Sequence, residues 1–248
     1  MLSRFQTCWI GIAAVITASV SPLHADHLAL YDFEGDWLKS YAAASGVTAG
    51  NFFWSATGLT QVTQATKGDN SSDPFPTSAA TGFDGWGPSD YSALSFRSVE
   101  AAGTSEAGAI ANNDYVAFAI TPHENVSLNL SLLEFKLSMS GTSGANTFFV
   151  RSSLDNYGTT LLSGTITTNY QKFSINLAEL GFVNISQTVQ FRIYFYTPGA
   201  VPSGSASNYV DKVLLQGTAI PEPNGFILLT AAGALFLLCR SSFGGKRA

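Results

Sequence analysis

The segment VQFRIYFY, at residues 189–196, alternates between two kinds of side chain. One set is apolar and consists of Val189, Phe191, Ile193 and Phe195, whereas the other consists of Gln190, Arg192, Tyr194 and Tyr196. Successive side chains of a β-strand point to opposite faces of its sheet. The alternation therefore predicts a strand with one face in a core and the other toward solvent.

The same two-residue period recurs through much of the chain, and turn-forming clusters such as Asp155–Gly158 separate the repeats. No convincing amphipathic helix lies between them. Evenly spaced strands of this kind predict an all-β fold, a two-sheet antiparallel jelly-roll-like sandwich of about eight or nine strands. The other predicted strands are 28–33, 94–99, 115–120, 133–139, 147–154, 160–167, 171–177 and 208–215.

The region from Asp36 to Ala93 is less regular, and turn formers are concentrated at residues 68–74 and 82–88. It predicts one or two short strands, around 51–55 and 59–63, joined by long loops. Long loops in a compact domain are usually either functional or mobile.

The N-terminus has the layout of a secretory signal peptide. Arg4 provides a positive charge, Cys8–Val20 is almost entirely apolar, and Pro22 and Ala25 follow as a helix breaker and a small residue for cleavage. We therefore expect residues 1–25 to be a signal peptide that directs export through the Sec machinery.

The C-terminus combines Ile220–Pro223, an apolar run Gly225–Cys239, and the basic residues Arg240, Lys246 and Arg247. As a helix the run would span about 22 Å, short of a hydrocarbon core of about 30 Å. Length alone leaves a short membrane helix and a buried helix nearly balanced. The basic residues beyond the run favour a membrane helix with a cytoplasmic tail.

This three-part order resembles the PEP-CTERM sorting signal of Gram-negative bacteria. The resemblance implies that Pro221, Glu222 and Pro223 are recognised by exosortase, a membrane transpeptidase that cleaves near them. It also implies a cell-envelope, outer-surface or extracellular-matrix location after transient anchoring in the inner membrane. The expected organisation is a signal peptide at 1–25, a β-sandwich at 26–219 and a sorting signal at 220–248.

The composition of residues 26–219 excludes several kinds of function. Eight Lys and Arg face sixteen Asp and Glu, a formal charge of −8, which argues against a nucleic-acid partner. Cys8 and Cys239 both lie in the terminal segments. If both ends are removed, the mature domain contains no disulfide, cysteine-based zinc site or thiol nucleophile.

The block from Tyr115 to Gly217 resembles the jelly-roll domains that often precede PEP-CTERM signals, and more distantly carbohydrate-binding jelly rolls. The segments that carry this resemblance are 140–144 (SGTSG), 150–155 (VRSSLD), 170–173 (YQKF), 191–194 (FRIY) and 210–213 (VDKV).

Three acidic residues form a candidate calcium site. Asp32 and Glu34 end the first predicted strand, and Asp211 lies on the last. First and last strands of jelly rolls are usually neighbours, and carboxylate oxygens suit Ca²⁺. A structural calcium ion often occupies this corner in the carbohydrate-binding jelly rolls that the chain resembles. The alternative is that these acids are solvated or hydrogen-bonded at strand ends.

Aromatic residues gather in the irregular region, where Trp86 and Tyr91 are candidate ligand-binding residues. Trp86 lies in the glycine-rich turn GFDGWGP at 82–88, which could hold its indole ring at the surface for stacking on a sugar. The alternative is that Trp86 covers one end of the core. The other aromatic residues of this region are Trp37, Phe52, Phe53, Trp54 and Phe83.

Catalytic patterns are weak. Only His27 and His123 remain after signal removal, neither in a suitable setting for a triad or a metal centre, and no acidic residue occupies a recognisable motif. We therefore assign no catalytic residue and no certain cofactor. The leading prediction is a non-enzymatic exported bacterial surface or matrix protein. A carbohydrate-binding module with structural calcium, bound to polysaccharide, is the alternative. A polysaccharide hydrolase or lyase, for example with Asp84 and Asp90, ranks last.

Overall fold

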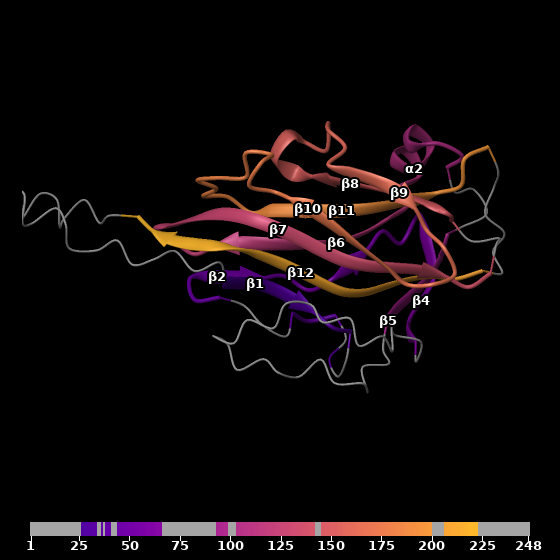
Figure 1. Ribbon diagram of the computed structural model, residues 1–248, viewed down its shortest axis with the longest axis horizontal. Helices are drawn as coiled ribbons and strands as arrows, with labels where there is room; N and C mark the ends of the chain where they lie inside the picture. Colours follow the sequence, from indigo (N-terminus) through magenta and orange to yellow (C-terminus); the bar gives the residue numbers. More distant parts are fainter. Residues whose placement is uncertain are drawn as a thin grey trace, which may run out of the picture.

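A computed structural model of the chain describes residues 26–33, 36, 38–40, 44–65, 93–98, 103–141, 145–199 and 206–222. This part of the chain forms two antiparallel β-sheets that pack face to face (Figure 1). The predicted all-β sandwich is confirmed. The predicted signal peptide and all but the beginning of the predicted sorting signal lie outside the described residues.

The first sheet, sheet A, has the strand order β10-β7-β12-β5-β4, and β1 also pairs with β12. The first and last strands are therefore neighbours, as expected from the sequence: Leu30 lies opposite Leu214. The bounds of these strands are β1 Asp26–Tyr31, β4 Leu59–Ala65, β5 Ala93–Ser98, β7 Val126–Met139, β10 Gln171–Asn176 and β12 Asn208–Pro221.

The second sheet, sheet B, has the order β2-β6-β11-β8-β9, and β3 pairs with β6. Strand β11 lies between β6 and β8, so its outer side chains have neighbours on both sides. The bounds are β2 Val47–Ala49, β3 Phe53–Trp54, β6 Tyr115–Pro122, β8 Thr147–Ser152, β9 Leu162–Thr165 and β11 Val189–Tyr196.

The core between the sheets is rich in aromatic rings. Phe118 of β6 stacks on Phe52, with 5.9 Å between ring centroids, and on Phe191 of β11 at 5.4 Å. Phe96 of sheet A meets Phe195 of sheet B at 4.7 Å. Each buried ring removes a large apolar area from water, and the contact of Phe96 with Phe195 joins the two sheets. The apolar side of β11 faces this core, as its alternation predicts.

Two short helical elements interrupt the strands. Helix α2, Glu106–Asn112, is capped by Ser105, whose hydroxyl accepts a hydrogen bond from the Gly108 amide. A 3₁₀ turn, η1 at Ser153–Asp155, follows β8. Helix α2 was not predicted, because seven residues are too few to show a helical period.

Strands β7 and β12 are longer than predicted. The sequence indicated 133–139 and 208–215, but the two strands pair from Asn208 opposite Met139 to Pro221 opposite Val126. The register shifts between Gln216 and Gly217, opposite residues 132 and 130. Such a β-bulge changes the phase of the side-chain alternation, so the two-residue period is broken within β7.

The hydrophobic segment 225–239 lies outside the described residues. Among the residues that are described, no helix is long and apolar enough to cross a membrane.

Candidate functional site

The outer face of sheet B carries an unusual concentration of tyrosine and arginine. In the register of β11 with β6, Tyr194 lies opposite Tyr115 and Arg192 opposite Ala117. On its other side, β8 places Arg151 opposite Arg192. The side of β11 that its alternation directs away from the core is therefore populated by rings and guanidinium groups.

One end of this face is covered. The rings of Phe149 and Tyr194 stack in parallel with centroids 4.7 Å apart, and Ala109 of α2 packs on them. Phe149 is fully buried, and Tyr194 is 1% exposed. Helix α2 thus covers Phe149 and Tyr194. The neighbouring side chains of Tyr115, Gln190 and Arg192 are half-buried. Figure 1 shows α2 above β8 and β9, at the upper edge of the view.

Arg192 is the centre of the half-buried part. Its Cζ atom lies 3.8 Å from the ring centroid of Tyr157 and 4.3 Å from that of Tyr115, both within cation–π range. The rings approach from opposite sides of β11, since Tyr115 belongs to β6 and Tyr157 follows β8. The guanidinium also donates through Nε to Oε1 of Gln190 at 2.9 Å and through Nη1 to the Tyr194 hydroxyl at 3.3 Å.

Tyr157 reaches Arg192 because its backbone adopts a left-handed conformation. Its φ is 60°, and that of Asn156 is 56°. A bulky residue in this region is a backbone outlier that the surroundings must hold in place, and such outliers cluster at functional sites. The Tyr157 hydroxyl donates to Oε1 of Gln190 at 2.6 Å, and burial raises its pKa. The Tyr157 side chain is therefore positioned by its backbone at one end and by the hydrogen bond of its hydroxyl at the other.

The loop that carries Tyr157 is held by several polar contacts. Arg151 donates through Nη1 to the Tyr157 carbonyl at 2.7 Å, and its Nη2 lies 3.3 Å from Oε2 of Glu106 on α2. The Asp155 carboxylate accepts from the amides of Gly158 and Thr159. Hydrogen bonding to Thr159 holds the pKa of Asp155 below its usual value. These contacts fix the loop against α2 and β8.

We call Tyr115, Tyr157, Gln190 and Arg192 the Tyr–Arg face. It offers two ring surfaces, an amide and a guanidinium that are already in position, and all four side chains are half-buried. The Glu106 carboxylate is paired with Arg151, which lies opposite Arg192 on β8. The arrangement is suited to binding, and the described part of the face shows no pair of acids placed for general acid–base chemistry.

Two of the three predicted calcium-binding residues, Asp32 and Asp211, are among the described residues. Asp211 lies on β12 directly opposite Lys136 of β7, and both are almost fully buried. Tyr31 pairs with Val213, so Asp32 follows beside the same part of β12. Glu34 lies outside the described residues. The described residues contain no group of three or more acids, histidines or cysteines able to hold a metal ion. Calcium binding by Asp32, Glu34 and Asp211 stays a prediction.

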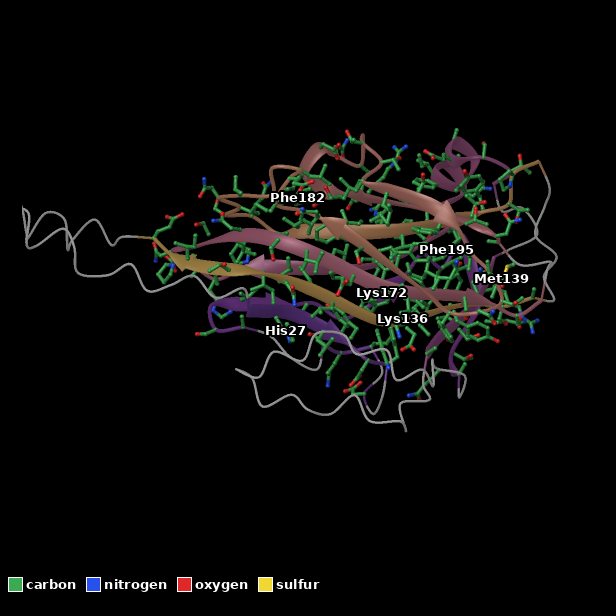
Figure 2. The ribbon with its side chains drawn as sticks, viewed as in Figure 1. His27, Lys136, Met139, Lys172, Phe182 and Phe195 are labelled. Atoms are coloured by element: carbon green, nitrogen blue, oxygen red, sulfur yellow. The ribbon has the colours of Figure 1, made fainter. Side chains whose placement is uncertain are left out.

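Basic residues are prominent beside Asp211 on sheet A. Lys172 of β10 lies opposite Lys136, as Figure 2 shows, and its ammonium is 3.4 Å from Oε1 of Glu134. Ser174 also donates to this oxygen at 2.8 Å. This side of β7 therefore alternates acid and base, and any cation near Asp211 would share it with an ammonium group.

The other predicted site residues are only partly described. Trp86 and Tyr91, the predicted ligand-binding residues, lie outside the described residues. Of the predicted sorting motif, Pro221 ends β12, and the Glu222 amide donates to the Asn125 carbonyl at 2.7 Å. Pro223 lies outside.

The alternation of the sequence predicts strand β11 correctly, but it does not predict the Tyr–Arg face. A solvated strand face usually carries small or charged residues, whereas that of β11 reads Gln190, Arg192, Tyr194 and Tyr196. This excess of rings was the available signal. No sequence pattern indicates that Tyr157 contacts Arg192, because this contact depends on the left-handed backbone of residues 156 and 157.

No protein-family model matches the chain, and no curated protein does. Among solved structures, it is similar to the CBM22-1 xylan-binding domain of Xyn10C from Paenibacillus barcinonensis, with 11% identity over 82% of this chain and 100% of that chain and a TM-score of 0.39. It is also similar to the family 11 carbohydrate-binding module from Clostridium thermocellum in complex with a β-1,3-1,4-mixed-linked tetrasaccharide, with 9% identity over 80% and 100% of the two chains and a TM-score of 0.33.

A Stig cyclase from Fischerella sp. TAU is similar at the same level, with 11% identity over 84% of this chain and 93% of that chain and a TM-score of 0.31. Scores this low carry no argument about the ligand or activity of the present chain.

Proposed function

We propose that this chain is a non-catalytic, glycan-binding β-sandwich and that its ligand lies on the Tyr–Arg face. The observation that carries the proposal is the fixed geometry of this face. Tyr115 and Tyr157 contact one guanidinium from two sides, and Gln190 accepts hydrogen bonds from both Tyr157 and Arg192. The side chains are therefore positioned before any ligand arrives.

Fixed aromatic and polar groups suit a sugar for two reasons. A ring surface packs on the C–H face of a pyranose, while amide, hydroxyl and guanidinium groups bond to its hydroxyls. Pre-positioned side chains lose little conformational entropy on binding, which matters for a weakly held, flexible polysaccharide.

The test is binding of the purified chain to a panel of neutral and acidic polysaccharides, measured by affinity electrophoresis and calorimetry. We expect Tyr115→Ala and Tyr157→Ala each to weaken binding by about 3- to 10-fold, as for a lost ring contact. Val183→Ala is the control, because it removes exposed apolar surface in a loop whose neighbouring residues bond to β7 of sheet A. If no glycan of the panel binds, or if both tyrosine variants bind like the parent, the proposal is wrong.

We also propose the route by which the domain reaches the cell surface: export by a signal peptide at 1–25 and sorting by exosortase at a PEP-CTERM signal at 220–248. Support comes from the order of the Pro-Glu-Pro motif, apolar run and basic tail in the sequence. The measurement is the intact mass of the protein from the cell envelope. A chain that begins near Asp26 and ends near Pro221–Pro223 is expected, whereas retention to Ala248 would contradict processing.

A further inference from the structure

We propose that the Tyr–Arg face selects an acidic sugar and that Arg192 binds the carboxylate of a uronate residue. The inference rests on the proposed glycan-binding function and adds the chemical class of the ligand. It follows from the state of the Arg192 guanidinium, which is fixed in place and half-buried while its charge has no protein counterpart in the described structure.

The donors of Arg192 are only partly used. A guanidinium has five N–H groups. Nε donates to Gln190 and Nη1 to the Tyr194 hydroxyl, whereas Nη2 donates to no residue that the structure describes. The contacts with Gln190 and Tyr194 fix the plane of the group, so the direction of the remaining N–H bonds is also fixed. Parallel N–H bonds of this kind match the two oxygens of a carboxylate.

Arg192 differs from its neighbour Arg151 in the groups that surround its positive charge. Arg151 lies opposite Arg192 on β8 and is paired with Glu106. Among the described residues, Arg192 is near no carboxylate within ion-pair distance, and its contacts are two electron-rich rings and two neutral oxygens. A half-buried cation held in this way has lost part of its hydration, so a ligand anion meets a smaller desolvation cost there than at an exposed lysine.

The overall charge of the chain does not prevent this. The full sequence carries a formal net charge of −5, which repels a polyanion at long range. At physiological ionic strength, however, the Debye length is about 8 Å, so contacts at the guanidinium dominate over distant charges. The repulsion also disfavours binding of an acidic polysaccharide elsewhere on the protein surface, where no contact with Arg192 offsets it.

The experiment compares polygalacturonate with the same polymer after methyl esterification, which removes the carboxylate charge and keeps the sugar backbone. Alginate serves as a second acidic polymer and mannan as a neutral one. We expect the parent chain to bind at least one acidic polymer about 10- to 100-fold more tightly than its neutral counterpart, with the preference reduced at high salt.

Three variants locate the effect. Arg192→Gln is expected to remove the preference for the acidic polymer, and Arg192→Lys to retain only part of it, because an ammonium lacks the two parallel donors. Arg97→Gln on β5 of sheet A makes the same change in net charge and is expected to leave the preference intact. The melting temperature of each variant is measured alongside, so that loss of folding is separated from loss of binding.

The outcomes distinguish the two proposals. If the chain binds neutral and acidic polymers equally, or if Arg97→Gln reduces the preference as much as Arg192→Gln, recognition of the carboxylate by Arg192 is wrong while glycan binding stands. If the chain binds a neutral glycan and no acidic one, the inference is also wrong. If no polymer binds, the glycan-binding proposal itself fails.

Discussion

The hydroxyl of Tyr157 donates a 2.6 Å hydrogen bond to Oε1 of Gln190, the same oxygen that accepts from Nε of Arg192. One amide oxygen thus connects the loop after β8 to strand β11. The contact explains how Tyr157 is held with its backbone in a left-handed conformation, and it joins the ring and the guanidinium into one unit.

Removal of this hydroxyl should loosen the loop without removing the ring. We expect Tyr157→Phe to lower the free energy of unfolding by about 0.5–1.5 kcal/mol, because one hydrogen bond is lost while Gln190 keeps its bond from Arg192. Urea denaturation measures this change. Tyr196→Phe is the control, since no hydrogen bond of the Tyr196 hydroxyl is described. An equal loss in both variants would contradict the proposed role of the contact.

Asp114 should make the protein less stable as the pH rises. Its carboxylate accepts from the Gly103 amide at 3.0 Å, but burial raises its pKa from 3.8 to about 6. The folded state therefore binds this proton more tightly than the unfolded state. The contribution of Asp114 favours folding below about pH 4, and it is lost as the pH rises through about 4 to 6.

The Asp114→Asn variant tests this prediction, because it keeps an oxygen acceptor for Gly103 and removes the charge. We expect it to be more stable than the parent at pH 7 by about 1–3 kcal/mol, and to show a smaller difference at pH 4.5. Urea denaturation at the two pH values measures both differences. A parent and variant with the same pH dependence would show that Asp114 is not the responsible group.

Gly217 should not tolerate even a methyl group. It lies at the irregularity in the pairing of β12 with β7, where a Cβ atom would be 2.4 Å from the Asn129 carbonyl oxygen and 2.8 Å from Cδ1 of Leu28. The carbonyl belongs to the neighbouring strand and cannot move alone. We expect Gly217→Ala to cost about 1–3 kcal/mol of unfolding free energy. Thr218→Ala, one residue further, is the control and should cost less. Equal costs would contradict the proposed close approach.

Calcium bound by Asp32, Glu34 and Asp211 should raise the melting temperature. A ligand at 100 times its dissociation constant adds about 2.7 kcal/mol to the stability of the folded state. We expect the increase with Ca²⁺ to be lost in Asp32→Asn and to be weaker with Mg²⁺, which prefers a tighter octahedral site. An unchanged melting temperature of the parent at millimolar Ca²⁺ would rule out this site.

The sequence predicted the strands with strict alternation and failed where a single residue breaks it. The bounds of β11 agree with the predicted 189–196, and the apolar side of the strand faces the core as expected. In β7, Leu132 and Leu133 are adjacent at the bulge, so the first half of the strand was not recognised. A bulge depends on the partner strand, and a single strand's sequence does not show it.

The candidate site was less predictable than the fold. Composition drew attention to Trp86 and Tyr91, whereas the described contacts gather around Arg192 instead. The spacing of Arg192 from Tyr157 in the sequence gives no reason for their contact. It arises from the reversal of the loop at Asn156 and from the pairing of β8 with β11, both of which are properties of the folded chain.

Strand β12 continues to Pro221, and Glu222 still donates to Asn125 of the β-turn before β7. Since β12 is hydrogen-bonded to β7 on one side and to β1 and β5 on the other, tension applied beyond Glu222 would enter the domain along the axis of an interior strand. The hydrogen bonds between β12 and β7 would then be loaded along the strand direction, starting from the pair Pro221 and Val126. The chain thus leaves the domain from the middle of sheet A, where withdrawal of β12 would disrupt its pairing with β7, β5 and β1.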